Sequence, residues 1–415
     1  GPPPPEGDGC ERDAFALAAE LRSLRTAVAV AEGMYELGER TATRLQDAAA
    51  EWGTAVFTRL AAWGLPGTIL TAWATWKVLP GDDGQKQQVV HRFLLEHPEL
   101  ITSPEFSDVV RRVVMNADDA ALALAGAPPG LARLLGEDGL GLIGVGTGAA
   151  VIIGAGAASG GRVLAETKVA VERVSEERAP AAPARAPSSA AERLERVPSE
   201  EQVRIERYDA PGEPPRYVVY VAPTQTFSPV ADHEPWDLTS NIAGVAGLPA
   251  GSIRATEQAM ADAGITASDE VVLVGFSQGG LVADAVAASG HWNTVGLETY
   301  GDPGGGIELP EGLRGVAVRH SDDFVVATGG PQGPTDRTIV ERRAFAAGAP
   351  LPTDELAPAH QKRAYAETAR MLDAASSPEL RRELDALDAF TREYVEREGA
   401  TVTTLRYRAE RVPDA

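Results

Sequence analysis

The 415-residue chain has very little cysteine and fewer basic than acidic residues. The first shortage excludes disulfides within the chain, and the second argues against polyanionic partners. Cys10 is the only cysteine, so no disulfide can form within the chain and the redox state of its compartment leaves no signature. Lysine and arginine number 38 against 60 aspartates and glutamates, which gives a formal net charge of −22 at pH 7. Because nucleic acids and anionic membranes attract basic patches, this balance argues against both as electrostatic partners.

The sequence also lacks the patterns that hold metals and cofactors. No cysteine or histidine group has zinc-site spacing, and neither a phosphate-binding loop nor an EF-hand occurs. We therefore expect no metal and no cofactor. Residues 1–10 have no basic segment and no apolar core, so they do not read as a classical signal peptide. Their proline and glycine content predicts a disordered tail.

Two parts of the chain differ in their hydrophobic periodicity. Apolar residues recur at three- and four-residue spacing from residue 11 onward, and no alternating strand pattern occurs before residue 200, so residues 11–178 are predicted to form an all-α helical domain. Residues 179–200 are rich in proline and alanine and are predicted to be a linker. In residues 201–415, apolar β-branched runs alternate with helical segments, which predicts an α/β domain with a doubly wound, mostly parallel sheet.

Within the second part, several elements can be placed from pattern alone. A hairpin at 203–208 and 216–221 is predicted to start the sheet, and residues 377–397 are predicted to form a charged helix. Residues 400–408 alternate apolar and polar side chains, as an edge strand does. The stretch 328–358 is rich in glycine and proline and is predicted to be a mobile loop that flanks the functional site.

The strongest chemical signal lies where an apolar run at 271–274 leads into Gly275-Phe276-Ser277-Gln278-Gly279 and then into a helical pattern of small residues. Gly-x-Ser-x-Gly between a strand and a helix is typical of a nucleophile elbow, a sharp turn that exposes its serine. The two glycines allow strand and helix to approach without a Cβ clash. Ser277 is therefore predicted to be a nucleophile, and the alternative is a buried turn serine in a plain βα unit.

A serine nucleophile needs a base, and the usual chain order in this context is serine, acid, histidine. Three histidines follow Ser277. His291 comes just after the elbow helix, and His320 ends a strand directly before the acid candidates. His360 follows the long loop and opens a helix, so it is the predicted general base.

The acid should follow a strand between the serine and the histidine. Asp323 comes directly after the strand at 315–320 and precedes apolar residues, so it is the preferred candidate. Two alternatives stay open. Asp322 is its neighbour, and Asp302 lies in a Tyr-Gly-Asp-Pro turn after the preceding strand.

Stabilising an oxyanion requires two converging N–H donors. Gln278, the residue after the nucleophile, is predicted to supply one of them. The loop after the strand at 217–222 is predicted to supply the other, from Thr224 or Gln225. Both stay open because a backbone donor leaves no side-chain signature.

Taken together, these motifs resemble an actinobacterial branch of the α/β-hydrolases over about residues 217–372. The resemblance rests on Pro223-Thr224-Gln225, Trp236-Asp237-Leu238-Thr239-Ser240-Asn241, Ser277-Gln278-Gly279-Gly280, Asp322-Asp323-Phe324-Val325 and His360. Pro223 departs from the family pattern, which has glycine there, and proline has no N–H to donate. The resemblance implies an α/β-hydrolase fold and the cleavage of an ester or thioester, without naming the acyl group.

Two features of the predicted helical domain bear on partners. Residues 139–161 carry no charge and could just cross a hydrocarbon layer of about 30 Å, although their glycine content favours a buried helix over membrane contact. Trp52-Gly53 and Trp63-Gly64 resemble the turn of WXG-type helical hairpins, which are export modules of type VII-like secretion, although core tryptophans are the favoured interpretation. A secretion-system or immunity partner therefore stays open, as do export by that route and a cytoplasmic location.

The sequence thus predicts a serine hydrolase that cleaves a small-molecule or lipid ester through Ser277, His360 and Asp323 and an acyl-enzyme intermediate. Three alternatives remain. The chain could be a secreted antibacterial effector of lipase type that its helical domain delivers. It could be an inactive binding protein with the hydrolase fold, or an acyltransferase.

Overall fold

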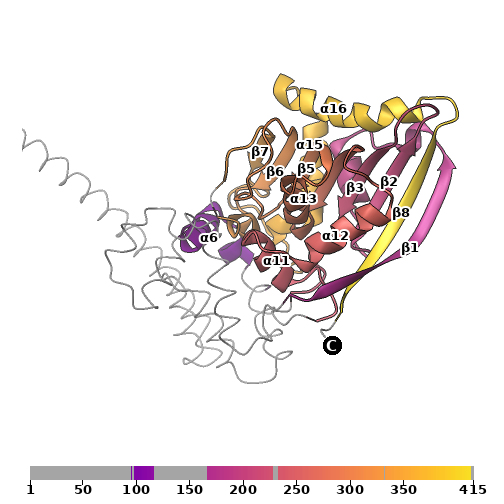
Figure 1. The fold of residues 1–415 in the computed structure, drawn as a ribbon. Helices are drawn as coiled ribbons and strands as arrows, with labels where there is room; N and C mark the ends of the chain where they lie inside the picture. Colours follow the sequence, from indigo (N-terminus) through magenta and orange to yellow (C-terminus); the bar gives the residue numbers. More distant parts are fainter. Residues whose placement is uncertain (1–94, 96–97, 116–165, 228–231, 331, 413–415) are drawn as a thin grey trace, which may run out of the picture. The chain divides into compact units, whose positions relative to one another are not determined.

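The computed structural model of the chain describes residue 95 and residues 98–115, 166–227, 232–330 and 332–412 (Figure 1). The predicted tail, the segment 139–161 and both Trp-Gly pairs lie outside these residues. The helical character predicted before residue 160 is therefore testable only at α5 (Pro98–Ile101) and α6 (Pro104–Met115), which are helices.

An eight-stranded mixed sheet organises the described part of the chain, with strand order β1-β8-β2-β3-β4-β5-β6-β7. The strands are β1 (Lys168–Pro180), β2 (Val203–Asp209), β3 (Arg216–Val221), β4 (Glu270–Phe276), β5 (Asn293–Tyr300), β6 (Gly315–His320), β7 (Thr338–Arg342) and β8 (Thr401–Val412). Strands β3 to β7 pair in parallel, whereas β1, β8, β2 and β3 pair antiparallel. The predicted α/β class with a mostly parallel sheet is confirmed.

Helices cover both faces of this sheet. They are α10 (Ala190–Arg196), α11 (Leu238–Val245), α12 (Gly251–Asp262), α13 (Gln278–Ala288), α14 (Phe324–Ala327), α15 (Lys362–Asp373) and α16 (Pro378–Val395), with 3₁₀ turns at Pro183–Arg185 and Pro358–His360. Because side chains alternate along a strand, the central strands feed two separate cores. Val272 and Val274 of β4 pack with α10, α15 and α16, while Val271 and Leu273 pack with α12 and α13.

The parallel strands β3 to β7 lie in chain order. A doubly wound sheet reverses its strand order at one point, and the described sheet does not, so the predicted doubly wound arrangement is wrong in that respect. Right-handed crossovers that always step the same way place their helices on the same face. This accounts for α12 and α13 sharing one core. The other face is covered by α10, which precedes the parallel strands, and by α15 and α16, which follow them.

The predicted boundary between a helical domain and a linker at residues 178 and 179 is wrong. Residues 168–180 form β1, which pairs with β8 along its length, so a stretch predicted to be helical belongs to the sheet. The predicted linker 179–200 contains α10, whose Ala190 and Leu194 are completely buried. Ser189 caps this helix, since its side chain accepts a hydrogen bond from the Glu192 N–H.

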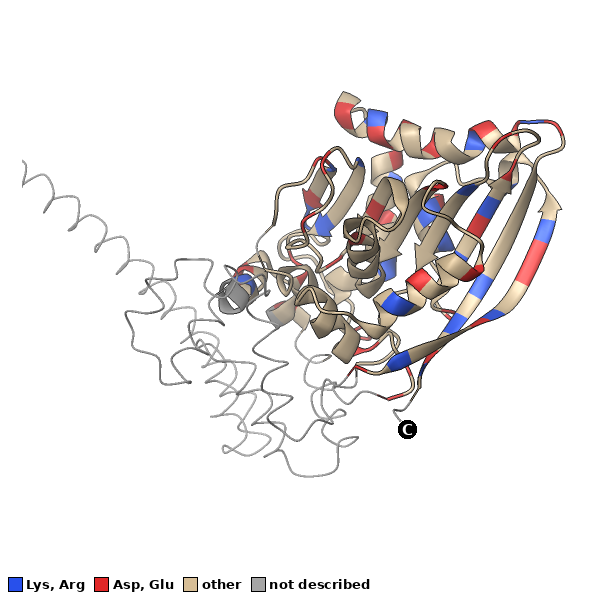
Figure 2. Cartoon of the chain, in the orientation of Figure 1, with Lys and Arg blue, Asp and Glu red and all other residues tan. Residues whose placement is uncertain are grey.

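The predicted edge strand and the predicted long loop also need correction. Strand β8 lies between β1 and β2 and is not an edge. The stretch 328–358 contains β7, so only part of it is loop. Charged side chains of both signs line the outer strand β1 (Figure 2), and such charges oppose edge-to-edge pairing with another chain. The predicted hairpin and the helix at 377–397 are confirmed as β2–β3 and α16.

Candidate active site

Ser277 occupies the sharp turn between β4 and α13. It has φ 56° and ψ −125°, a positive-φ conformation that a non-glycine residue adopts only at a cost of about 1–3 kcal/mol. Its N–H donates to the Tyr300 carbonyl at 2.8 Å, which ties the turn to the end of β5. A Cβ added to Gly275 would lie 2.2 Å from the Gly279 carbonyl oxygen, and one on Gly279 would lie 2.1 Å from the Val221 oxygen. The predicted steric role of both glycines is confirmed.

The structure brings Ser277, His360 and Asp323 together at the carboxyl edge of the parallel strands. His360 Nε2 lies 2.7 Å from Ser277 Oγ, and His360 Nδ1 lies 2.7 Å from Asp323 Oδ2. Asp323 is buried, and the His360 side chain is only 12% exposed. With Nδ1–H donating to the carboxylate, Nε2 is the nitrogen that can accept the serine proton. The His360 ring also stacks on Phe276, with centroids 5.4 Å apart.

The other two candidate acids are engaged elsewhere. Asp322 accepts the N–H groups of Ala344 at 2.7 Å and Phe345 at 3.1 Å, so it holds the segment that follows β7. Asp302 accepts from the Thr299 hydroxyl at 2.7 Å and from the Gly304 N–H at 3.0 Å. Of the three carboxylates that the sequence left open, only Asp323 contacts His360.

At the same edge lie two of the chain positions that were predicted to donate N–H groups to an oxyanion, Gln278 and Thr224. Gln278 begins α13, and Gly279 packs against the carbonyls of Val221 and Ala222, which holds the start of this helix against the end of β3. Neither the Gln278 N–H nor the Thr224 N–H donates a hydrogen bond to another described residue. The prediction for Gln225 is wrong, because its N–H donates to the Trp236 carbonyl at 2.7 Å.

The segment 236–241 holds the loop after β3 in place. The Asn241 side-chain amide donates to Thr224 Oγ1 at 2.9 Å. The Trp236 carbonyl accepts from Gln225, and the Asp237 carbonyl accepts from the Gln278 side chain at 3.3 Å. Both predicted donor positions are thus tied to the same short segment.

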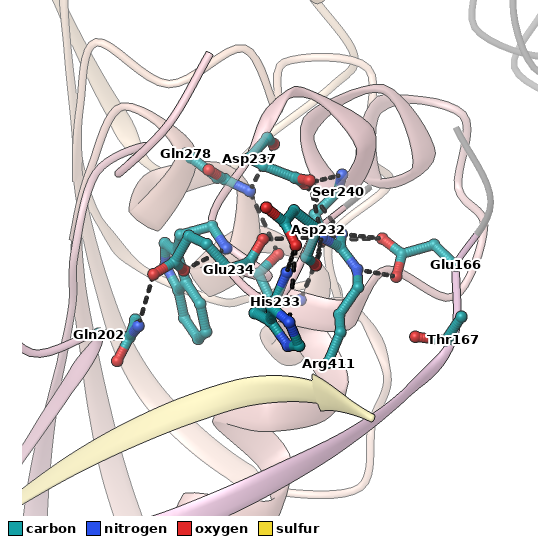
Figure 3. Close-up of polar contacts among 12 residues, drawn as sticks. Glu166, Thr167, Gln202, Asp232, His233, Glu234, Asp237, Ser240, Gln278 and Arg411 are labelled. Atoms are coloured by element: carbon teal, nitrogen blue, oxygen red, sulfur yellow. Dashed lines mark hydrogen bonds and ion pairs between the residues drawn. The ribbon is translucent and has the colours of Figure 1, made fainter. Parts of the chain in front are cut away.

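Arg411, near the end of β8, binds this segment and the Glu234 carbonyl just before it (Figure 3). Its guanidinium binds both carboxylate oxygens of Asp237, at 2.6 and 2.8 Å, and reaches Glu166 at 3.1 Å. It also donates to the Glu234 carbonyl at 2.7 Å and to Ser240 Oγ at 3.0 Å. Asp237 in turn caps α11 by accepting from the Ser240 N–H.

The two rejected histidines have other surroundings. His291 is exposed and lies 3.0 Å from Glu257. His320 is buried, and burial lowers its pKa, which favours the neutral ring. Its Nδ1 lies 2.7 Å from the Ala359 carbonyl and its Nε2 lies 2.8 Å from the Thr368 hydroxyl. A neutral His320 therefore holds the turn that carries His360 by donating to the residue before it.

Sequence reasoning missed Tyr365, Arg411 and this role of His320. The Tyr365 hydroxyl donates to Asp323 Oδ2 at 2.7 Å. Nothing in a local pattern distinguishes it from a core tyrosine on a helix. Arg411 lies in a strand pattern, and its partner Asp237 is 174 residues away.

In the described part of the chain, no group of three or more histidine, cysteine or acidic residues is placed to hold a metal ion. None of the helices described there is long and apolar enough to cross a membrane. An open groove of about 760 Å³ is lined by residues of α10 and by Arg204, and it shares no residue with the Ser277 site.

No protein-family model, curated protein or solved structure matches the chain.

Proposed function

We propose that the chain is a serine hydrolase that cleaves a carboxylic ester through Ser277, His360 and Asp323. The observation that carries this proposal is the unbroken hydrogen-bond chain from Ser277 Oγ through the imidazole to the Asp323 carboxylate, with both contacts at 2.7 Å. The three residues come from positions far apart in the sequence, and the serine adopts the strained positive-φ conformation that is typical of a nucleophile elbow. The resemblance to the α/β-hydrolases over residues 217–372 points the same way.

In the proposed reaction, Ser277 Oγ attacks the ester carbonyl carbon while His360 Nε2 takes the serine proton. Asp323 holds the imidazole in the tautomer with the proton on Nδ1 and stabilises the imidazolium that forms. The N–H groups of Gln278 and Thr224 stabilise the oxyanion. His360 then gives its proton to the leaving alcohol. Water next attacks the acyl-enzyme carbonyl while His360 Nε2 takes a proton from the water, and His360 returns a proton to Ser277 Oγ as the acid product leaves.

The test is a Ser277→Ala variant assayed on p-nitrophenyl esters of graded chain length. Removal of a serine nucleophile lowers kcat by about 10⁶-fold in the best-studied cases, so activity should fall to the background of the assay. Turnover by the variant at the parental rate would show that Ser277 is not the nucleophile.

Labelling with a fluorophosphonate separates the enzyme from an inactive binding protein of the same fold. The parent should be labelled at Ser277, and the Ser277→Ala variant should not. A parent chain that is folded, inert towards the probe and inactive on every ester would contradict the proposal. If labelled parent consumes the ester only when an alcohol acceptor is added, the chain is an acyltransferase instead.

A further inference from the structure

The Asp323 carboxylate receives more hydrogen bonds than the proposed reaction needs. His360 Nδ1 and the Tyr365 hydroxyl both bind Oδ2, each at 2.7 Å, and the Val325 N–H binds Oδ1 at 3.0 Å. The histidine and the tyrosine therefore share one carboxylate oxygen. A hydrogen bond to one side of that oxygen reduces the negative charge available on the other.

The surroundings of Tyr365 direct its hydroxyl proton to the Asp323 carboxylate. Its ring is fully buried and stacks on the His320 ring, with centroids 3.9 Å apart and planes at 15°. The ring also fills the space beside Gly301, where an added Cβ would lie 2.8 Å from it; Gly301 itself has φ +60°. The backbone N–H of His320 donates to the tyrosine oxygen at 3.2 Å. Because that side of the oxygen accepts, the hydroxyl donates its own proton to Asp323.

The tyrosine also keeps that proton. Burial, and next the negative charge of Asp323, raise the pKa of Tyr365 well above the ordinary value, so the hydroxyl is neutral throughout the range in which a hydrolase would operate. A neutral buried tyrosine is a constant donor and not a titrating group.

We propose that Tyr365 is a positioning residue, which orients the Asp323 carboxylate and lowers the basicity of His360 by sharing Oδ2 with it. The inference rests on the proposed function and goes beyond it, because the proposed reaction uses only three side chains. Without the hydroxyl, Oδ2 carries more charge and stabilises a protonated imidazole better. His360 would then be protonated at a higher pH, where it cannot act as a base.

The side chains of the other titratable and charged groups around this pair are held by partners other than the Tyr365 hydroxyl. Asp302 lies at the end of β5, and Asp322 binds the chain after β7. Arg342 of β7 donates to Thr368 Oγ1 at 2.9 Å, and His320 of β6 favours its neutral form. None of these groups contacts Asp323 Oδ2, the oxygen that His360 and Tyr365 share.

The test compares the pH dependence of kcat/KM in the full-length parent and in a Tyr365→Phe variant. The acid limb of the profile should move to higher pH by about half a unit, and kcat at its optimum should fall by roughly 3- to 10-fold with little change in KM. The matched control is Tyr208→Phe. This tyrosine is equally buried and donates to a carboxylate, Glu206, at the same 2.7 Å, but it does not touch the three residues.

A Tyr365→Phe profile that coincides with the parental profile would overturn the inference, and so would an equal shift in Tyr208→Phe. Should the phenylalanine variant not fold, 3-fluorotyrosine at position 365 keeps the ring and makes the hydroxyl a stronger donor. The acid limb should then move to lower pH, and no movement would again overturn the inference. Failure of the proposed function looks different, because the parent would then show no activity that depends on Ser277.

Discussion

The Arg411→Met substitution should lower the free energy of unfolding by about 3–5 kcal/mol, because it removes one partner of a buried ion pair. Arg411 is 4% exposed and Asp237 is 1% exposed, and the two are joined by contacts at 2.6 and 2.8 Å. Without the guanidinium, the Asp237 carboxylate keeps the Ser240 N–H at 2.9 Å but has no cation near it. Methionine fills much of the space, but the substitution also removes the hydrogen bonds of Arg411 to Glu166, the Glu234 carbonyl and Ser240 Oγ, so a second substitution is needed to isolate the orphaned charge.

Urea unfolding of the full-length chain, followed by circular dichroism, measures this loss. With a denaturant slope of about 1–3 kcal/mol per molar urea, the midpoint should fall by roughly 1–5 M. Adding Asp237→Asn to Arg411→Met removes the orphaned charge while keeping a residue that caps a helix well. The double variant should therefore regain about 1 kcal/mol or more over the single variant.

Arg173 provides a matched control on the same side of the sheet. It binds Asp262 through two nitrogens, at 2.9 and 2.7 Å, but the two side chains are 35% and 53% exposed. Arg173→Met should cost no more than about 1 kcal/mol, because water screens this pair. Equal losses in Arg173→Met and Arg411→Met would refute the argument that burial, and not geometry, sets the difference.

Two further predictions concern the proposed acid and the buried histidine. Asp323→Asn should lower kcat on p-nitrophenyl esters by about 10⁴-fold while Asp322→Asn stays within about tenfold, since only the first carboxylate holds the His360 tautomer; a larger loss in Asp322→Asn would contradict this assignment. Burial lowers the pKa of His320, so the stability linked to it is present above the ordinary histidine pKa of about 6.5 and is lost as pH falls from there towards the folded-state pKa. His320→Gln should therefore flatten the decline in unfolding free energy between about pH 7.5 and 5, and an unchanged decline in urea titrations would contradict it.

The residues that local motifs define were predictable from sequence, and those defined by distant contacts were not. Ser277 and its two glycines form one continuous pattern, and His360 follows from chain order. The sequence favoured Asp323 but left Asp322 and Asp302 open, and only the coordinates show which of the three carboxylates contacts His360. The exclusion of Gln225 as a proposed oxyanion donor needed them too, since its N–H already has an acceptor.

Strands β1 and β7 were not predicted from the sequence, and distant contacts explain this too. In β1, charged residues that favour a helix fall on positions that stay mostly exposed, so no apolar alternation marks it. Its conformation comes from pairing with β8, more than 200 residues away. Strand β7 is only five residues long and follows a stretch rich in glycine and proline, so its short alternating pattern does not stand out from the predicted loop. By contrast, β3 and β4 are buried on both faces and read as continuous apolar runs.

The corrected boundary changes which part of the chain must be regarded as one folding unit with the candidate site. A domain that began at residue 201 would lose β1 and expose the long edge of β8, and it would also lose α10 and the buried Leu194. It would further lose Glu166, which contacts both Arg411 and Ser240. Arg411 holds Asp237, and the segment after Trp236 holds the loop that carries Thr224. The geometry around the proposed oxyanion donors thus depends on residues that lie 245 positions apart along the chain, near the start of β1 and near the end of β8, and the unit that supports this site begins no later than residue 166.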